Sequence, residues 1–216
     1  MIIRLRRQQV KATDKQFFIA EDLPRKVDEA NVKKEKKAGN LKVVWISRIA
    51  PKKNLKYAIE ILEETKSDIE FTIYGPAHTE EYWKECKQEL RKLPSNVKWE
   101  WKGNLDSESV VETLKHYHVF LFPTLGENFG HVIQEALSAG CPCIISDQTP
   151  WRDFESHGVG YVFSLENKSA FVNAVEKYAV MKQEEFQNAV EKAHQYAIDV
   201  SNSKAKNTGY RTIFEI

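Results

Sequence analysis

Short apolar runs alternate with amphipathic stretches along most of the chain. Each apolar run predicts a buried strand, and each stretch with apolar residues three and four positions apart predicts a helix packed against the strands. Strands are expected at residues 42–47, 69–74, 97–101, 119–122, 141–147 and 160–163, and helices at 54–66, 79–92, 107–116, 129–139, 168–181, 184–198 and 202–216. This alternation predicts an α/β fold, a Rossmann-like parallel sheet with helices on both faces.

The regular pattern divides the chain into three parts. Residues 41–200 form the predicted domain, residues 1–40 a lead-in or linker, and residues 201–216 a last helix. In the lead-in, residues 16–20 have the pattern of a short strand, and Lys33–Asn40 has the composition of a charged helix end or linker. Because no aromatic residues interleave its lysines, we interpret this charged run as a solvated surface and not as a nucleic-acid site.

Composition limits the broad class of the protein. A chain of 216 residues, 42% of them hydrophobic, can bury the core of one ordinary domain. The net charge is +1, yet residues 1–42 hold twelve Lys and Arg against six Asp and Glu, a local excess that permits contact with an anionic membrane surface. No signal peptide and no run of about 20 apolar residues is present, so a cytoplasmic location is expected.

The cysteines are few and match no metal-binding pattern. Cys86, Cys141 and Cys143 lie at spacings unlike those of zinc sites. We therefore interpret them as reduced, structural thiols.

The most informative stretch is Gly126–Gly140, which follows one apolar strand and precedes another. Asn128, a favourable N-cap, stands at the expected start of a helix whose apolar residues recur at helical spacing. The unpaired N–H groups of such a helix start attract phosphate or sugar oxygens. Glu127 in the turn, and Glu135 in the helix but off the apolar stripe, are placed to enter the same crevice.

Other candidate residues follow the remaining strands. In an open parallel sheet, ligands bind outside the carboxyl ends of the strands. The loop after the first strand holds Arg48 and Lys53, a forked guanidinium and a point charge that together suit a diphosphate. The turns Tyr74-Gly75 and Gly103-Asn104 let the backbone approach a flat ring closely.

Three common signatures are absent from the sequence. No G-x-G-x-x-G follows a predicted strand, and no G-x-x-x-x-G-K-[ST] occurs, which disfavours a nicotinamide or flavin dehydrogenase and a P-loop kinase. The nucleophile elbow G-x-S-x-G of hydrolases is also missing.

Aromatic and histidine residues carry weaker signals. His131, in the first turn of the helix, is expected at most to touch the pocket. Trp45, Trp99 and Trp101 are interpreted as core or strand-face residues and not as sugar-stacking platforms. The sequence leaves open whether Trp151 covers the crevice.

Several of these motifs occur together in one enzyme family. Arg48 with Lys53, Gly103 ahead of a helix, the stretch Gly126–Pro142 with its two glutamates, and Ser146-Asp147 follow one another at the family's intervals. Over about residues 41–180, the chain resembles the C-terminal, donor-binding domain of a family 4, GT-B-type retaining glycosyltransferase. Residues 147–151 further resemble members that build bacterial capsule, exopolysaccharide or lipopolysaccharide.

The resemblance implies a site for a nucleotide-diphosphate sugar, with a UDP-sugar as the favoured donor and with no cofactor or metal. Catalytic roles are implied for Arg48 and Lys53, which would hold the diphosphate, and for Glu127, which would hold the donor sugar. Glu135 would accept hydrogen bonds from the ribose hydroxyls. The other implied substrate contacts are Asn128, Phe129, Gly130, His131, Tyr74, Gly75, Gly103 and Asn104.

The implied function is glycosyl transfer, with retention, to a saccharide or lipid-linked acceptor. Such enzymes also have an N-terminal acceptor domain, of which residues 1–25 resemble a remnant. We therefore expect an acceptor domain or partner subunit to complete the cleft, and no nucleic-acid partner. Two alternatives remain: a non-catalytic nucleotide-sugar-binding or regulatory subunit, and a sugar-nucleotide epimerase.

Overall fold

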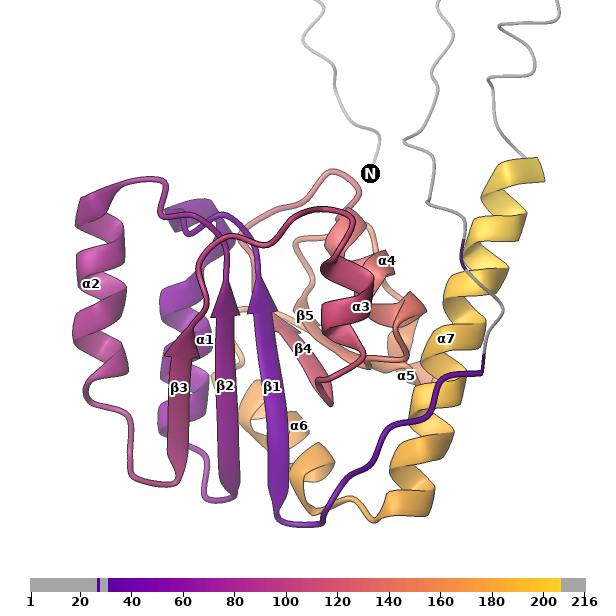
Figure 1. Ribbon diagram of the computed structural model, residues 1–216, viewed down its shortest axis with the longest axis horizontal. Helices are drawn as coiled ribbons and strands as arrows, with labels where there is room; N and C mark the ends of the chain where they lie inside the picture. The colour runs from indigo at the N-terminus through magenta and orange to yellow at the C-terminus, as the bar shows by residue number, and fades with distance from the viewer. Residues whose placement is uncertain (1–26, 28–30, 207–216) are drawn as a thin grey trace, which may run out of the picture.

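The computed structural model describes residue 27 and residues 31–206. They form a parallel sheet with the strand order β3-β2-β1-β4-β5-β6 (Figure 1). The strands are β1 (Asn40–Ile46), β2 (Asp68–Tyr74), β3 (Val97–Trp101), β4 (Val119–Phe122), β5 (Cys143–Ser146) and β6 (Gly160–Phe163). Every predicted strand that falls within the described residues is present, and three of them have the predicted bounds.

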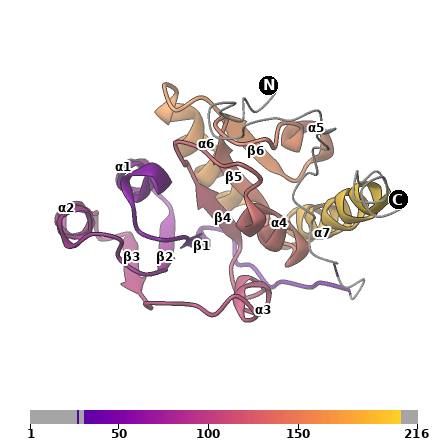
Figure 2. The ribbon, with the colours of Figure 1, turned by 90° about the horizontal axis from the view of Figure 1, so that it is seen from above.

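Helices cover both faces of this sheet. They are α1 (Leu55–Glu63), α2 (Glu80–Leu90), α3 (Val110–Leu114), α4 (His131–Ser138), α5 (Phe154–His157), α6 (Lys168–Val180) and α7 (Gln183–Lys206), with a 3-10 turn, η1, at Pro51–Lys53. Helices α1, α2 and α6 lie on one face, and α3, α4 and α7 lie on the other (Figure 2). Among the described residues, none of the helices combines the length and the apolar character that a membrane span requires.

The core lies around the central strands. All residues of β4 and β5 are buried, which explains their continuous apolar sequences, because both faces of these strands are covered. Trp45 of β1 is fully buried and packs edge-on against Phe122 at 6.1 Å between ring centroids. On α1, the apolar stripe that predicted a helix, for example Leu55 and Ile59, is buried against the sheet.

The strand order changes direction between β1 and β4. Strands β2 and β3 follow β1 on one side, whereas β4, β5 and β6 follow one another on the other side. The carboxyl ends of β1 and β4 therefore form the switch point of the sheet, where the ligand crevice of an open α/β sheet is expected. The loop after β1 contains Arg48 and Lys53, and the loop after β4 contains Glu127.

The start of α4 differs from the prediction. The helix begins at His131, and its N-cap is Gly130 with φ 78°, so the prediction of Asn128 as the N-cap is wrong. Glycine is required here because φ is positive and because a Cβ atom at Gly130 would lie 2.8 Å from Ile133 Cδ1. The N–H groups of Asn128 and Phe129 consequently belong to the preceding turn and not to the helix.

The C-terminal part also differs from the prediction. Helix α7 runs without a break from Gln183 to Lys206, so the separate helix expected from residue 201 is, within the described residues, a continuation of α7. Residues 207–216 lie outside the described residues, as do the expected strand at 16–20 and the possible acceptor-domain remnant at 1–25.

The interpretation of Lys33–Asn40 as a solvated surface is wrong for two of its lysines. Residues 31–37 form an extended segment along which exposed and buried side chains alternate. Lys34 is buried and donates hydrogen bonds to the carbonyls of Leu114 at 2.9 Å and Tyr117 at 2.6 Å. Lys36 donates in the same way to two carbonyls at the end of α6, at 2.7 and 3.1 Å. Burial lowers the pKa of both lysines.

Two glutamines on α7 bind the backbone of this extended segment. Gln187 accepts from Lys34 N at 3.1 Å and donates to Val32 O at 2.9 Å. Gln183, one turn earlier, accepts from Lys36 N at 2.6 Å and donates to Lys34 O at 2.9 Å. The segment before β1 is therefore joined to the last described helix, along the right side of Figure 1.

Candidate functional site

Two predicted site residues form an ion pair at the crevice. Lys53 Nζ, at the end of η1, contacts a carboxylate oxygen of Glu127, in the turn after β4. Both side chains are partly exposed, at 18% and 12%. Lys53 Nζ also lies 5.8 Å from the centre of the Phe122 ring. The structure therefore brings a cation and a carboxylate together at the switch point of the sheet.

Further bonds hold the two loops together. Leu125 N donates to Lys52 O at 2.9 Å. Asn54 Nδ2 donates to Pro123 O at 2.8 Å, and Asn54 has the left-handed backbone with φ 57°. A small polar residue that tolerates this conformation thus ends the loop that carries Lys53.

Trp151 binds the turn that contains Glu127. The indole N–H of Trp151 donates to Phe129 O at 2.7 Å, and the two rings pack at 5.6 Å. Trp151 is only 7% exposed, so it supports the turn and does not cover the crevice. Asn128 is exposed, whereas Phe129 and Gly130 are buried.

Helix α4 places two further candidates. His131 is exposed at the helix start, with its ring 4.7 Å from that of Phe129. Glu135 lies one turn later and is 7% exposed, so it is not an ordinary surface carboxylate. Arg48 is exposed, and its guanidinium makes no hydrogen bond or ion pair with the described residues.

The ends of β2 and β3 meet at the other side of the crevice. Gly75 N donates to Gly103 O at 2.7 Å, and Trp101 Nε1 donates to Gly75 O at 3.0 Å. Asn104, the next residue, is exposed. Gly75 and Gly103, two of the residues predicted to contact the base, are therefore joined by a hydrogen bond.

Tyr74 has a structural partner. Its hydroxyl lies 3.0 Å from the hydroxyl of Tyr117, and its ring packs edge-on against that of Tyr117. Burial, together with this hydrogen bond, raises the pKa of Tyr74 to about 12. The Tyr74 side chain therefore binds the segment before β4, and its backbone is the part that lies at the strand end.

Comparison with known proteins now assigns the family. The family model described as glycosyl transferases group 1 matches residues 26–196. The chain belongs to this family. A Caenorhabditis elegans protein named GDP-Man:Man(3)GlcNAc(2)-PP-Dol alpha-1,2-mannosyltransferase is 27% identical over an alignment of 137 residues, which covers 56% of this chain and 29% of the relative.

Solved structures show the fold of this group 1 glycosyltransferase chain. A Staphylococcus aureus TarM mutant in complex with Fondaparinux, alpha-GlcNAc-glycerol and UDP matches with a TM-score of 0.66 and 19% identity, over 84% of this chain and 37% of TarM. WaaG, a glycosyltransferase involved in lipopolysaccharide biosynthesis, matches with a TM-score of 0.64 and 17% identity, over 85% of this chain and 54% of WaaG. Anabaena Alr3699/HepE in complex with UDP and glucose matches with a TM-score of 0.62 and 18% identity, over 78% of this chain and 48% of HepE.

These comparisons confirm the predicted Rossmann-like α/β fold, and the chain forms a GT-B glycosyltransferase domain. It spans between 29% and 54% of the length of these four proteins.

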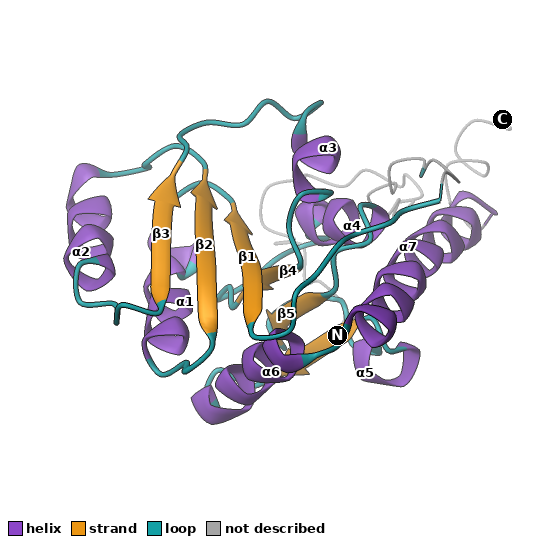
Figure 3. Ribbon diagram, turned by 60° about the horizontal axis from the view of Figure 1, so that its bottom comes forward, coloured by secondary structure: helices purple, strands orange, loops and turns teal. Residues whose placement is uncertain are grey.

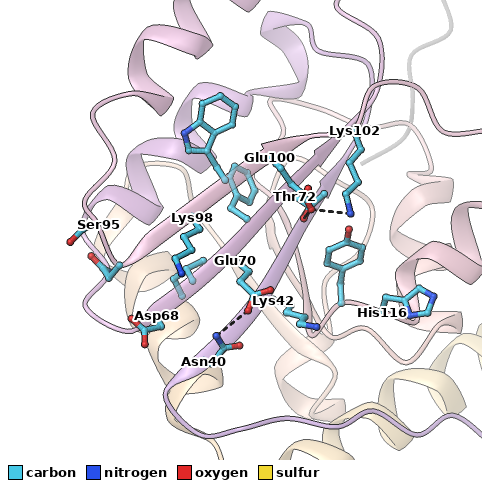
Figure 4. A pocket seen from close by; sticks show the side chains of 15 residues that line it. Asn40, Lys42, Asp68, Glu70, Thr72, Ser95, Lys98, Glu100, Lys102 and His116 are labelled. Carbon is cyan, nitrogen blue, oxygen red and sulfur yellow. Dashed lines mark hydrogen bonds and ion pairs between the residues drawn. The ribbon is translucent and has the colours of Figure 1, made fainter.

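A pocket of about 680 Å³ in this glycosyltransferase domain lies elsewhere (Figure 4). It lies over the face of β2 and β3 that no described helix covers (Figure 3). Its polar groups bind one another: Glu100 contacts Lys102 at 2.9 Å and Thr72 at 3.1 Å. No predicted site residue lines this pocket.

The three cysteines of the domain are free and buried. Burial raises the pKa of the Cys86 thiol to about 11 and also raises those of Cys141 and Cys143. The described residues contain no group of three or more His, Cys, Asp or Glu side chains placed to hold a metal ion.

Sequence reasoning missed several residues that shape the site. They are Lys52, Asn54 and Thr124, whose side chains or carbonyls join the two loops. The available signal was position alone: Thr124 is a polar residue directly after an apolar strand and its proline.

Proposed function

We propose that this chain is the donor-binding domain of a family 4, retaining GT-B glycosyltransferase. It binds a nucleotide-diphosphate sugar and takes part in transfer of the glycosyl group to a saccharide or lipid-linked acceptor. The observation that carries the proposal is the Lys53–Glu127 pair at the switch point, with the buried Glu135 on the adjacent helix. Two compared structures contain UDP, and the C. elegans relative is named for GDP-mannose, which supports a nucleoside diphosphate as the leaving group.

Each residue has a chemical task in this proposal. Lys53 and Arg48 contact the diphosphate, and Glu135 accepts hydrogen bonds from the ribose hydroxyls. The backbone at Gly75 and Gly103 lies against the base. Glu127 and the N–H groups of its turn bind the donor sugar, because the sugar lies on the far side of the diphosphate from the base.

The transfer step requires charge stabilisation above all. The bond between the anomeric carbon and the diphosphate oxygen breaks, and the sugar passes through an oxocarbenium-like state. The oxygen of an acceptor hydroxyl then bonds to the anomeric carbon on the face that the diphosphate leaves, and the hydroxyl proton passes to the departing diphosphate. Negative charge develops on the leaving diphosphate, so fixed cations beside it lower the barrier. Arg48 and Lys53 supply that charge, and the proposed reaction therefore needs no metal ion.

The remaining parts of the proposal concern the setting of the reaction. The acceptor is bound with the help of an acceptor domain or partner subunit, and the products are bacterial surface polysaccharides. The reaction takes place in the cytoplasm or at the inner face of the membrane.

A binding experiment tests the site. The melting temperature of the 216-residue chain is measured with the diphosphates of uridine, guanosine, adenosine and cytidine, and calorimetry then gives the affinity for the best one. Arg48→Ala and Glu135→Ala should each weaken binding at least about tenfold, equal to about 1.4 kcal/mol. Arg91→Ala and Glu166→Ala are the matched controls, because both side chains are exposed in turns that hold no predicted site residue.

Two results would contradict the proposal. One is that no nucleoside diphosphate raises the melting temperature of the wild-type chain. The other is that both site variants bind as tightly as the wild type.

A further inference from the structure

A fully buried threonine lies between the loop that carries Lys53 and the turn that carries Glu127. Thr124 directly follows β4 and Pro123, and its exposure is 0%. Its hydroxyl donates to Lys52 O at 3.1 Å and accepts from Gly126 N at 3.2 Å. One hydroxyl therefore contacts the loop after β1 and the turn after β4 at the same time, which requires a group that is both donor and acceptor.

A second buried hydroxyl fixes the threonine itself. Ser146, the last residue of β5, has 0% exposure, and its Oγ donates to Thr124 O at 2.5 Å. Glu127 N in turn donates to Gln148 O at 3.0 Å, two residues after Ser146. The loops after β1, β4 and β5 are thus joined through Thr124, and a buried, fully bonded network of this kind is rigid.

The bonds to Thr124 bear directly on the two charged side chains. Lys52 O, which Thr124 binds, belongs to the residue before Lys53, and Gly126 N belongs to the residue before Glu127. A shift of either loop therefore moves one member of the ion pair relative to the other. Displacement of a binding group by about 1 Å costs about a hundredfold in rate in well-placed sites.

We propose that Thr124 is a positioning residue whose buried hydroxyl fixes the Lys53 loop on the turn that carries Glu127 and so holds Lys53 where a nucleoside diphosphate binds. Ser146 holds Thr124 in place. The inference rests on the proposed function, since it takes the Lys53 loop as the diphosphate contact. Two other bonds between the loops, Leu125 N to Lys52 O and Asn54 Nδ2 to Pro123 O, do not involve the hydroxyl, so a variant without it keeps the fold.

The test compares Thr124→Val, which keeps the shape but removes the hydroxyl, with Thr124→Ser, which keeps the hydroxyl. Calorimetry measures the affinity of the 216-residue chain for UDP and for GDP, and amide hydrogen exchange is followed in peptides covering residues 48–54 and 123–131. Thr124→Val should bind about tenfold more weakly and exchange faster in both peptides. Thr124→Ser should resemble the wild type, and Ser146→Ala should change both quantities in the direction of the valine variant.

Each outcome has one meaning. If the valine variant binds UDP and GDP as tightly as the wild type, with unchanged exchange in both peptides, the positioning role is overturned. A lower melting temperature with neither change also overturns it, because that is the effect of a merely structural residue. If the valine variant does not fold, Ser146→Ala decides the question by the same measurements. If the wild type binds neither diphosphate, the proposed function fails, while hydrogen exchange still tests the link between the loops.

Discussion

Lys53 and Glu127, separated by 74 positions in the sequence, form an ion pair across the carboxyl edge of the sheet. The lysine ends the turn after β1, and the glutamate lies in the turn after β4. In the free protein, the Glu127 carboxylate is therefore bound to the Lys53 ammonium group that the proposed diphosphate needs. The diphosphate must compete with Glu127 for Lys53, or bind next to the intact ion pair.

This competition predicts opposite effects of two substitutions. Glu127→Gln should tighten binding of UDP or GDP by up to about fivefold, because exposed and partly exposed charge pairs contribute about 0.2–1 kcal/mol. Lys53→Met should weaken the same binding at least about tenfold, since it removes a charge-assisted bond. Calorimetry at constant ionic strength measures both affinities. Weaker binding by Glu127→Gln would argue against the competition.

Two glycines at the crevice should respond very differently to a methyl group. A Cβ atom at Gly75 would lie 1.8 Å from Ser47 O, and φ is +128°, so the backbones of β1 and β2 would have to separate. Gly75→Ala should lower the free energy of unfolding by about 3 kcal/mol or more, because it adds both a clash and a strained backbone.

Gly103→Ala is the matched control. Among the described residues, apart from its own chain neighbours, no atom lies within 4 Å of the added Cβ, and the positive φ of 73° opposes the substitution. Its cost should be about 1 kcal/mol. Urea unfolding of both variants gives the comparison, and equal losses would show that the contact with Ser47 relaxes at little cost.

The buried lysine before β1 should be essential to stability, while its neighbour should not. Lys34→Met keeps the volume but leaves the carbonyls of Leu114 and Tyr117 without this donor. We expect a loss of about 2 kcal/mol in the free energy of unfolding, the typical cost of unpaired buried polar groups. Lys33→Met, at an exposed position, should change it by less than about 0.5 kcal/mol. Equal stabilities in urea would contradict a structural role for Lys34.

His118 should make the stability depend on pH. Lys42 N donates to its Nδ1 at 2.9 Å, so its Nε2 carries the proton and donates to Glu35 O at 3.0 Å. Burial, helped by the nearby lysines, lowers the pKa of His118 from 6.5 to about 4. The neutral ring is therefore the form that the fold accommodates.

The direction of this pH effect follows from the fact that the unfolded chain binds the proton of His118 at a higher pH than the folded chain does. As the pH falls below 6.5, the unfolded chain protonates His118 while the folded chain does not, so stability decreases until the pH reaches about 4. The full effect is about 3 kcal/mol at 1.36 kcal/mol per pKa unit. His118→Gln can make both hydrogen bonds without titrating. The difference between wild type and variant in urea unfolding should therefore shrink or reverse from pH 7.5 to pH 5.

Much of the fold could be predicted because buried segments have recognisable patterns of apolar residues in the sequence. The continuous apolar sequences of β4 and β5 follow from cover on both faces, and the stripe on α1 follows from contact on one face. Lys53 and Glu127 could be assigned to the same edge of the sheet because parallel strands bring their carboxyl ends to one edge. The role of Thr124 could not be predicted, since its buried hydroxyl binds backbone carbonyl and N–H groups, which carry no sequence signal.

The sequence by itself determined the α/β architecture, the edge of the sheet that carries the site and the residue types available there, because these depend on periodicity and on strand direction. The tertiary structure decided which groups pair. Lys34 is buried because its partners, 80 and 83 positions away, are carbonyls that carry no sequence signal. Gly130, not Asn128, precedes α4 because the turn needs a positive φ. Such choices depend on contacts between distant segments, and these exist only once the chain is folded.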